Sequence, residues 1–121
     1  NICSNESLVA LSAAMYLAYM GRQGLREVAM LCYHKAHYAA AEIARLKNYK
    51  VISTAPFFNE FVVECPKPVD EINQVLLKKD ILGGYDLEKD YPHAANQMLL
   101  CVTELNSRSQ IDALVAGLQS I

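Results

Sequence analysis

The hydrophobic pattern of this chain changes its period at Tyr49, and that change sets the fold class. Before Tyr49, over residues 24–48, apolar side chains recur every three or four positions, which is typical of one face of a helix. After it, residues 50–53 and 60–65 follow the shorter period of half-buried strands. The sequence therefore predicts an α+β fold in which two helices precede a small sheet.

The first helix is expected between Ser4, a suitable N-cap, and Gly21, which can take the left-handed conformation that ends a helix. Its apolar residues point in nearly every direction around the axis. They are Leu8, Val9, Leu11, Met15, Tyr16, Leu17, Tyr19 and Met20. A surface helix would carry such residues on one side only. We therefore expect burial on more than one side by a surface outside this domain, and self-association of the chain when that surface is missing.

The rest of the chain alternates helix and strand. Residues 68–79 have the spacing of a helix, and residues 98–103 are apolar enough for a central strand. Ser107 and Gln110 form a capping box that begins a last helix. We expect a mostly antiparallel sheet with helices packed on one face, and we interpret residues 1–121 as a single domain.

Charge and hydropathy argue against two classes of partner. The chain has a net charge of −2, with 20% charged and 53% hydrophobic residues, which favours neither disorder nor binding to a polyanion. The longest apolar stretch, residues 8–20, is broken by Ser12 and is shorter than the roughly 20 residues that cross a bilayer. We expect no nucleic acid and no membrane among the partners.

The start of the chain and its cysteines add two expectations. Asn1 is not preceded by an initiator methionine or a signal sequence, so we expect a fragment of a larger polypeptide. Cys3, Cys32, Cys65 and Cys101 are scattered, without a CxxC pair or a Cys/His cluster at zinc spacing. The last three lie in or beside apolar runs, where cysteine packs as a small hydrophobe. We expect reduced thiols, no metal site and a cytoplasmic location.

Motifs for catalysis are missing from the sequence. It contains no GxSxG turn for a serine nucleophile and no Gly-Lys-Ser/Thr phosphate loop. His34-Lys35-Ala36-His37 offers two imidazoles and an amine, which could bind a metal or form a Schiff base. At 100° per residue, however, the histidines lie away from the core stripe and Lys35 on its flank. We interpret these as solvated or interface positions and assign no catalytic, cofactor-binding or metal-binding residue.

Three pairs of residues are candidates for a cleft or an interface. They are Asn59 and Glu60, Gly83 and Gly84, and Thr103 and Glu104. The first and third pairs stand at strand ends, where small domains often face a cleft, although ordinary solvation of turns is the alternative. The glycine pair either lets the backbone approach another surface closely or supplies a positive φ to a turn.

Several segments, in one order, resemble a known family. They are residues 1–8, 16–21, 24–29, 34–38, 56–63, 81–84 and 101–104. The most specific is Phe57-Phe58-Asn59-Glu60-Phe61, followed at the right distance by Ile81-Leu82-Gly83-Gly84. Over essentially its full length the chain resembles subunit 1 of glycine dehydrogenase (decarboxylating), the family of split P-proteins of the glycine cleavage system.

This resemblance implies the carboxy-terminal small domain of an aspartate aminotransferase-like (fold type I) pyridoxal phosphate enzyme. In that family glycine is decarboxylated and its aminomethyl group passes to the lipoyl arm of the H-protein, with the cofactor as electron sink. The Schiff-base lysine lies in subunit 2, so the resemblance implies that subunit 2 holds the cofactor and that Lys35 does not. It also implies subunit 2 and the H-protein as partners, in a heterotetramer.

Three functions remain open for the chain itself. The first is an enzyme fragment that supports a subunit interface beside the cofactor site. The second is a stand-alone module, because the order of elements after Tyr49 could form a rearranged ferredoxin-like domain that binds a small ligand. The third is a purely structural oligomerisation domain.

Overall fold

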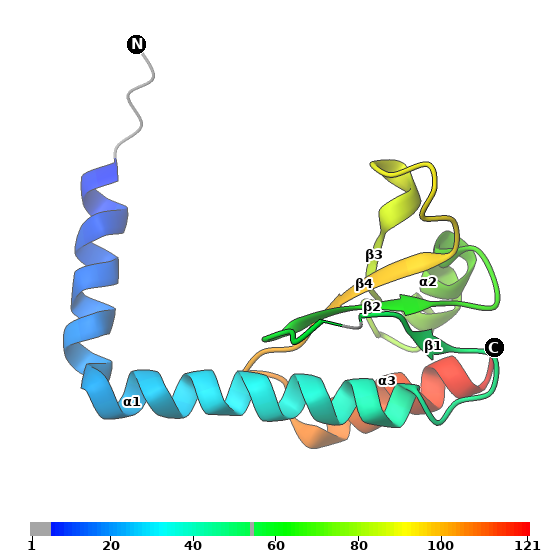
Figure 1. The fold of residues 1–121 in the computed structure, drawn as a ribbon. Coiled ribbons are helices and arrows are strands. Elements are labelled where there is room, and N and C mark those ends of the chain that lie inside the picture. The colour runs from blue at the N-terminus through cyan, green and yellow to red at the C-terminus, as the bar shows by residue number, and fades with distance from the viewer. Residues whose placement is uncertain (1–5, 54) are drawn as a thin grey trace, which may run out of the picture. The chain divides into compact units, whose positions relative to one another are not determined.

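The computed structural model describes residues 6–53 and 55–121 (Figure 1). The chain divides into two compact units, Asn1–Met30 and Leu31–Ile121. The elements, in order, are α1 (Glu6–Ile43), β1 (Lys50–Val51), β2 (Glu60–Glu64), α2 (Val69–Leu77), β3 (Tyr85–Asp86), the 3-10 helix η1 (Leu87–Lys89), β4 (Gln97–Cys101) and α3 (Arg108–Gln119). This order confirms the α+β fold class, and a single interrupted helix stands where two were expected.

The first unit consists of the first part of α1. Gly21 interrupts α1 with a φ of 60° and a ψ of −176°, so a positive φ at this glycine is confirmed, but its ψ is not that of the left-handed helical conformation expected there. The helix resumes directly after Gly21, whereas a connection as far as Gly24 was expected. Ser4, the expected N-cap, lies outside the described residues.

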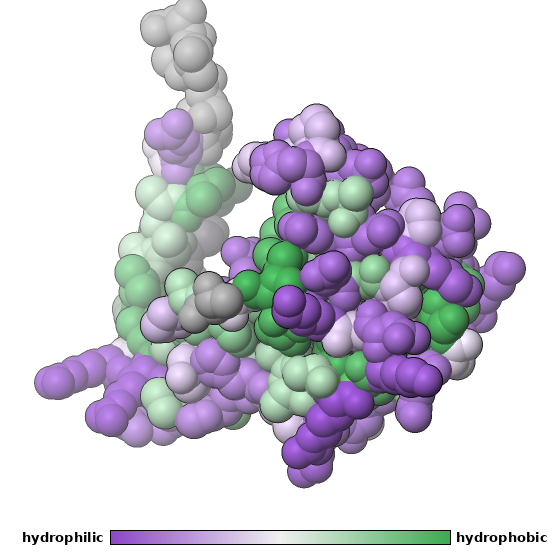
Figure 2. Space-filling view, turned by 45° about the vertical axis from the view of Figure 1, so that its right-hand side comes forward, coloured by the Kyte–Doolittle hydropathy of each residue, from purple (hydrophilic) through white to green (hydrophobic). Residues whose placement is uncertain are grey.

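Apolar side chains surround α1 between Glu6 and Gly21. Figure 2 shows them as green atoms along the helix that follows the grey terminus. No other described helix or strand belongs to this unit, so these side chains have no packing partner within it. An isolated helix of this kind is marginal in water. The expectation that another surface covers it stays a prediction.

The second unit is built on a four-stranded sheet with the order β1-β2-β4-β3, in which all neighbouring strands are antiparallel. The expected central position of β4 is confirmed. Phe61 lies opposite Leu100 and Val63 opposite Met98, and all four side chains are buried. Because side chains alternate along a strand, these pairs define the core face of the sheet.

Helical segments cover the core face, which confirms the expected layering (Figure 1). Their buried residues are Ala36, Ala39, Ala40 and Ile43 from α1, Val69, Ile72 and Leu76 from α2, and Ile111 and Leu118 from α3. The alanines let α1 approach the sheet closely. At the expected capping box, Ser107 Oγ accepts from the Gln110 amide (3.2 Å) and Gln110 Oε1 accepts from the Ser107 amide (2.7 Å).

The cysteines of the described residues are all free thiols, as expected. Cys32 and Cys65 are buried, but Cys101 is exposed. The expectation that Cys101 packs as a buried hydrophobe is wrong, because the alternation along β4 places it on the face opposite to Leu100 and across from Glu60. Cys3 lies outside the described residues.

Candidate functional site

Gly83 and Gly84 are packed between α2 and β4. The Asn73 side-chain amide donates to the Gly84 carbonyl (2.9 Å). A β-carbon on Gly83 would overlap Asn73 Oδ1, and one on Gly84 would lie 2.5 Å from the Leu99 carbonyl oxygen and overlap Met98. Neither glycine has a positive φ. Of the two alternatives for this pair, close approach of the backbone is therefore the correct one, and the surfaces it approaches belong to this chain.

Glu104 connects the loop after β4 to α1, and Thr103 forms hydrogen bonds within that loop. The Thr103 amide donates to Asn106 Oδ1 (2.8 Å). The Cys32 thiol donates to the Glu104 carboxylate (3.3 Å), and Lys35 Nζ donates to the Glu104 carbonyl. Burial, and then the bond to Glu104, raises the pKa of the Cys32 thiol. A thiol held protonated in this way is a poor nucleophile, so the cluster fixes the loop.

Lys35, beside His34, is the lysine considered above for a Schiff base with pyridoxal phosphate. Its amine is half-buried and engaged by the Glu104 carbonyl. At the start of α3 the Gln110 amide is occupied by Ser107 Oγ, and α2 begins with the acidic Asp70 and Glu71, whose charge opposes the binding of a phosphate. These residues do not fit a Schiff-base site for that cofactor. Whether the chain is free of cofactor stays a prediction.

His34 and His37 occupy different environments. His34 is exposed, as expected. The His37 ring packs between Tyr33 and Phe57, with ring centroids 3.9 and 4.1 Å apart, and its Nε2 is buried without a hydrogen-bond partner among the described residues. Of the two alternatives for His37, a solvated position is wrong, because Phe57 from the following loop covers the imidazole, and an interface position stays a prediction. Within the part of the chain that the structure describes, no three His, Cys, Asp or Glu side chains form a metal-binding group.

Glu60 stands at the start of β2, and it lines the same groove as Gly83 and Gly84. This groove has a volume of about 810 Å³ and lies between residues 80–85, the end of β4 and the first half of α3. Asn59 is near it: its side-chain amide donates to Cys101 Sγ (3.5 Å), and its carbonyl accepts from the Val102 amide (2.9 Å). The structure thus brings three of the six candidate residues into one groove. Thr103 and Glu104 are not among its lining residues.

Sequence reasoning missed the residues that complete the groove. Leu82 projects from its wall and is 87% exposed, while Gln110 and Leu114 come from α3. A leucine directly before a glycine pair was the available signal for Leu82. The contribution of α3 depends on tertiary packing and has no signal in the sequence.

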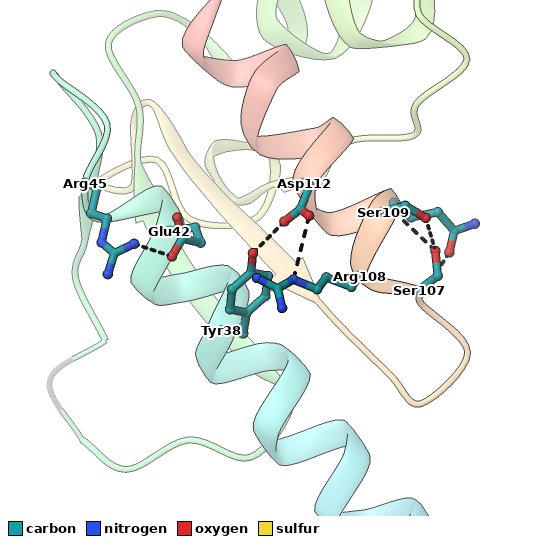
Figure 3. Close-up of polar contacts among 8 residues, drawn as sticks. Tyr38, Glu42, Arg45, Ser107, Arg108, Ser109 and Asp112 are labelled. Carbon is teal, nitrogen blue, oxygen red and sulfur yellow. Dashed lines mark hydrogen bonds and ion pairs between the residues drawn. The ribbon is translucent and has the colours of Figure 1, made fainter.

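A polar cluster holds α3 against α1 (Figure 3). The Tyr38 hydroxyl donates to Asp112 Oδ1 (2.6 Å), and this bond raises the pKa of Tyr38. The Arg108 guanidinium lies over the Tyr38 ring, 4.9 Å from its centroid, and its Nε is 3.8 Å from Asp112 Oδ2. This cluster sets the position of the helix that forms one side of the groove.

Solved structures share this fold. An inhibitor-bound glycine decarboxylase (P-protein) of the glycine cleavage system matches 99% of this chain and 27% of its own, with a TM-score of 0.87 and 33% identity. A phosphoserine aminotransferase from Cytophaga hutchinsonii matches 86% of this chain and 28% of its own, with a TM-score of 0.63 and 18% identity, which shows the fold alone. The chain has the fold of a domain of aspartate aminotransferase-like (fold type I) enzymes.

Sequence comparison identifies the family. The model of the glycine cleavage system P-protein family matches residues 1–118. A probable glycine dehydrogenase (decarboxylating) subunit 1 from Thermomicrobium roseum is 54% identical over 98% of this chain, and one from Brevibacillus brevis is 50% identical over all of it. The chain belongs to the glycine cleavage system P-protein family. It spans 27% of the length of each of these relatives.

Family membership bears on two of the expectations from the sequence. The resemblance to this family is confirmed. The alternative of a stand-alone ferredoxin-like module that binds a small ligand is not supported, because the whole second unit matches a part of a P-protein. Among the described residues, no helix combines the length and the hydropathy that a membrane span requires.

Proposed function

We propose that this chain is the carboxy-terminal small domain, residues 1–121, of subunit 1 of a glycine dehydrogenase (decarboxylating). The observation that carries the proposal is the match over 98–100% of the chain to two probable subunits of that name at 50–54% identity, together with a TM-score of 0.87 to a P-protein. In the whole enzyme glycine is the substrate, and its aminomethyl group passes to the lipoyl arm of the H-protein. The enzyme is cytoplasmic and assembles with subunit 2 as a heterotetramer.

Within that enzyme the domain supports an interface and takes no part in the chemistry. Subunit 2 holds the pyridoxal phosphate, which supplies the electron sink for decarboxylation. The proposal is supported by Lys35, whose amine is engaged by the Glu104 carbonyl, and by Ser107 Oγ, which occupies the Gln110 amide at the start of α3. What this chain contributes is a fixed loop at Thr103 and Glu104 and a groove lined by Glu60, Gly83 and Gly84.

A domain exchange tests the proposal. The corresponding part of the Thermomicrobium roseum subunit 1 is replaced by residues 1–121, and the chimera is combined with subunit 2 and the H-protein. We expect glycine-dependent release of CO2 at a rate close to that of the unaltered relative, because the two domains are 54% identical. A Lys35→Arg chimera is the matched control and should keep this activity, since arginine can still donate to the Glu104 carbonyl but cannot form a Schiff base. A chimera that assembles with subunit 2 but releases no CO2 contradicts the proposal.

A further inference from the structure

The edge of β4 is uncovered beyond its pairing with β3. That pairing is limited to Tyr85 opposite Leu99 and Asp86 opposite Met98. On the other side of β4, the Val102 amide donates to the Asn59 carbonyl of the strand that becomes β2 (2.9 Å). Because hydrogen-bonding directions alternate along a strand, the amide and carbonyl of Cys101 point to the uncovered edge. No described residue forms a backbone hydrogen bond with them there.

Packing on α2 keeps this edge open. The Asn73 amide holds the Gly84 carbonyl, and Gly83 lies so close to α2 that a β-carbon would be 3.0 Å from Leu76 Cδ1. Gly84 still lies against Met98 and Leu99 of β4, but Gly83 follows α2 and does not pair with Cys101. The space left between the segment before β3, the edge of β4 and α3 is the groove of about 810 Å³.

The lining of the groove indicates the chemistry of its occupant. Leu82 and Leu114 supply apolar surface, and Gln110 supplies a side-chain amide. Glu60 and Asp80 add two exposed carboxylates, and no lysine, arginine or histidine lines the groove. Neither carboxylate has an ion-pair partner within residues 6–53 and 55–121. An extended segment with apolar side chains and one basic side chain is complementary to such a surface.

We propose that this groove receives an extended segment from the rest of subunit 1, which adds to β4 as a further strand. Its backbone pairs with Cys101, and a lysine or arginine side chain meets Glu60 or Asp80. The source is the same subunit because the chain spans only 27% of its relatives, and an exposed strand edge in a folded protein is ordinarily covered. The inference rests on the proposed function, in which this chain is one domain of that subunit.

Hydrogen exchange at single amides tests the added strand. The Cys101 amide should exchange at least ~100-fold more slowly in the complete subunit 1 than in the 121-residue chain, because strand pairing ties its exchange to local opening. The Val102 amide, which already donates to Asn59, is the internal control and should be protected in both. A Cys101 amide that exchanges equally fast in the two proteins overturns the proposal.

A pair of variants separates strand addition from general burial. Leu82→Asp adds a third carboxylate to the groove and should return the Cys101 amide of the complete subunit to fast exchange. Leu105→Asp is the matched control, because Leu105 is 83% exposed and does not line the groove. It should leave Cys101 protected. Unchanged protection in Leu82→Asp overturns the proposal. Hydrogen exchange is measured without glycine turnover. If the Cys101 amide is protected in a complete subunit 1 that is inactive, the added strand is supported and only the proposed function is contradicted.

Discussion

At Gly84, the absence of one β-carbon allows the segment before β3 to lie against β4. We predict that Gly84→Val lowers the free energy of unfolding by about 1–3 kcal/mol, because the new side chain meets the Leu99 carbonyl, which belongs to the backbone and cannot swing away. Urea unfolding followed by circular dichroism measures the change.

Gly24→Ala is the control for Gly84→Val. The nearest atom to its new β-carbon would be the flexible end of Met20, at 3.1 Å, so its stability should stay within about 1 kcal/mol of the unchanged chain. A Gly84→Val chain as stable as the unchanged one would show that the segment before β3 adapts freely.

Cys65 makes the stability of the chain sensitive to alkaline pH. Burial, with a smaller contribution from the charge of Glu64, raises the pKa of its thiol from 9.0 to about 11. Between these two values the folded chain keeps a proton that the unfolded chain has lost, so the free energy of unfolding falls as the pH rises. The stabilisation is fully present below pH 9 and is lost by about pH 11. Burial acts in the same direction on Tyr49, whose pKa is raised to about 12.

Urea unfolding at several pH values between 8 and 11 tests this prediction. Cys65→Val removes the titrating group while keeping an apolar side chain, and it should make the decline with pH shallower. Cys101→Val alters an exposed thiol and should keep most of the decline. A decline that is unchanged in Cys65→Val would assign the alkaline sensitivity to other groups.

At the scale of elements, the sequence predicted those helices and strands whose positions depend on residues close together in the chain. The alternation in residues 60–64 and the capping box at Ser107 each place an element correctly. β1 is shorter than expected because after Val51 the chain pairs irregularly: the Ile52 amide still donates to Val62, but the Val62 amide donates to the Ser53 hydroxyl. Here the Ser53 hydroxyl accepts a hydrogen bond in place of a backbone carbonyl. The period of the hydrophobic residues does not predict such a replacement.

The candidate site was predictable only in part, for the same reason. Glu60, Gly83 and Gly84 were found from their positions at strand ends and turns, and they share one groove. Asn73, which holds Gly84, looks from the sequence like an ordinary polar residue of an amphipathic helix. The groove itself follows from the packing of α3 against the sheet, so it could be recognised only in three dimensions.

At the scale of the whole molecule, the two units differ in how they satisfy their apolar side chains. The second unit has a closed core, in which Phe61, Ile72, Met98 and Leu118 are fully buried. The first unit offers one helix with apolar residues on all sides, and its described residues, 6–30, include no second element to cover them. A contiguous apolar surface of this kind is typical of a protein–protein or domain interface. We predict that this surface is covered by the rest of the polypeptide or by a partner subunit.

The last prediction follows from that difference: the 121-residue chain should self-associate through the helix before Gly21. Size-exclusion chromatography with light scattering should give a mass above 13.5 kDa that rises with concentration. Tyr16→Asp and Met20→Asp should each shift the chain toward the monomer, because a carboxylate in an apolar contact costs more free energy than the contact supplies. Ser12→Asp, a charge at a position that is already polar, should have the smaller effect. A monomer at high concentration that binds no apolar dye would contradict the prediction, since it would mean that these apolar side chains are already covered within a single chain.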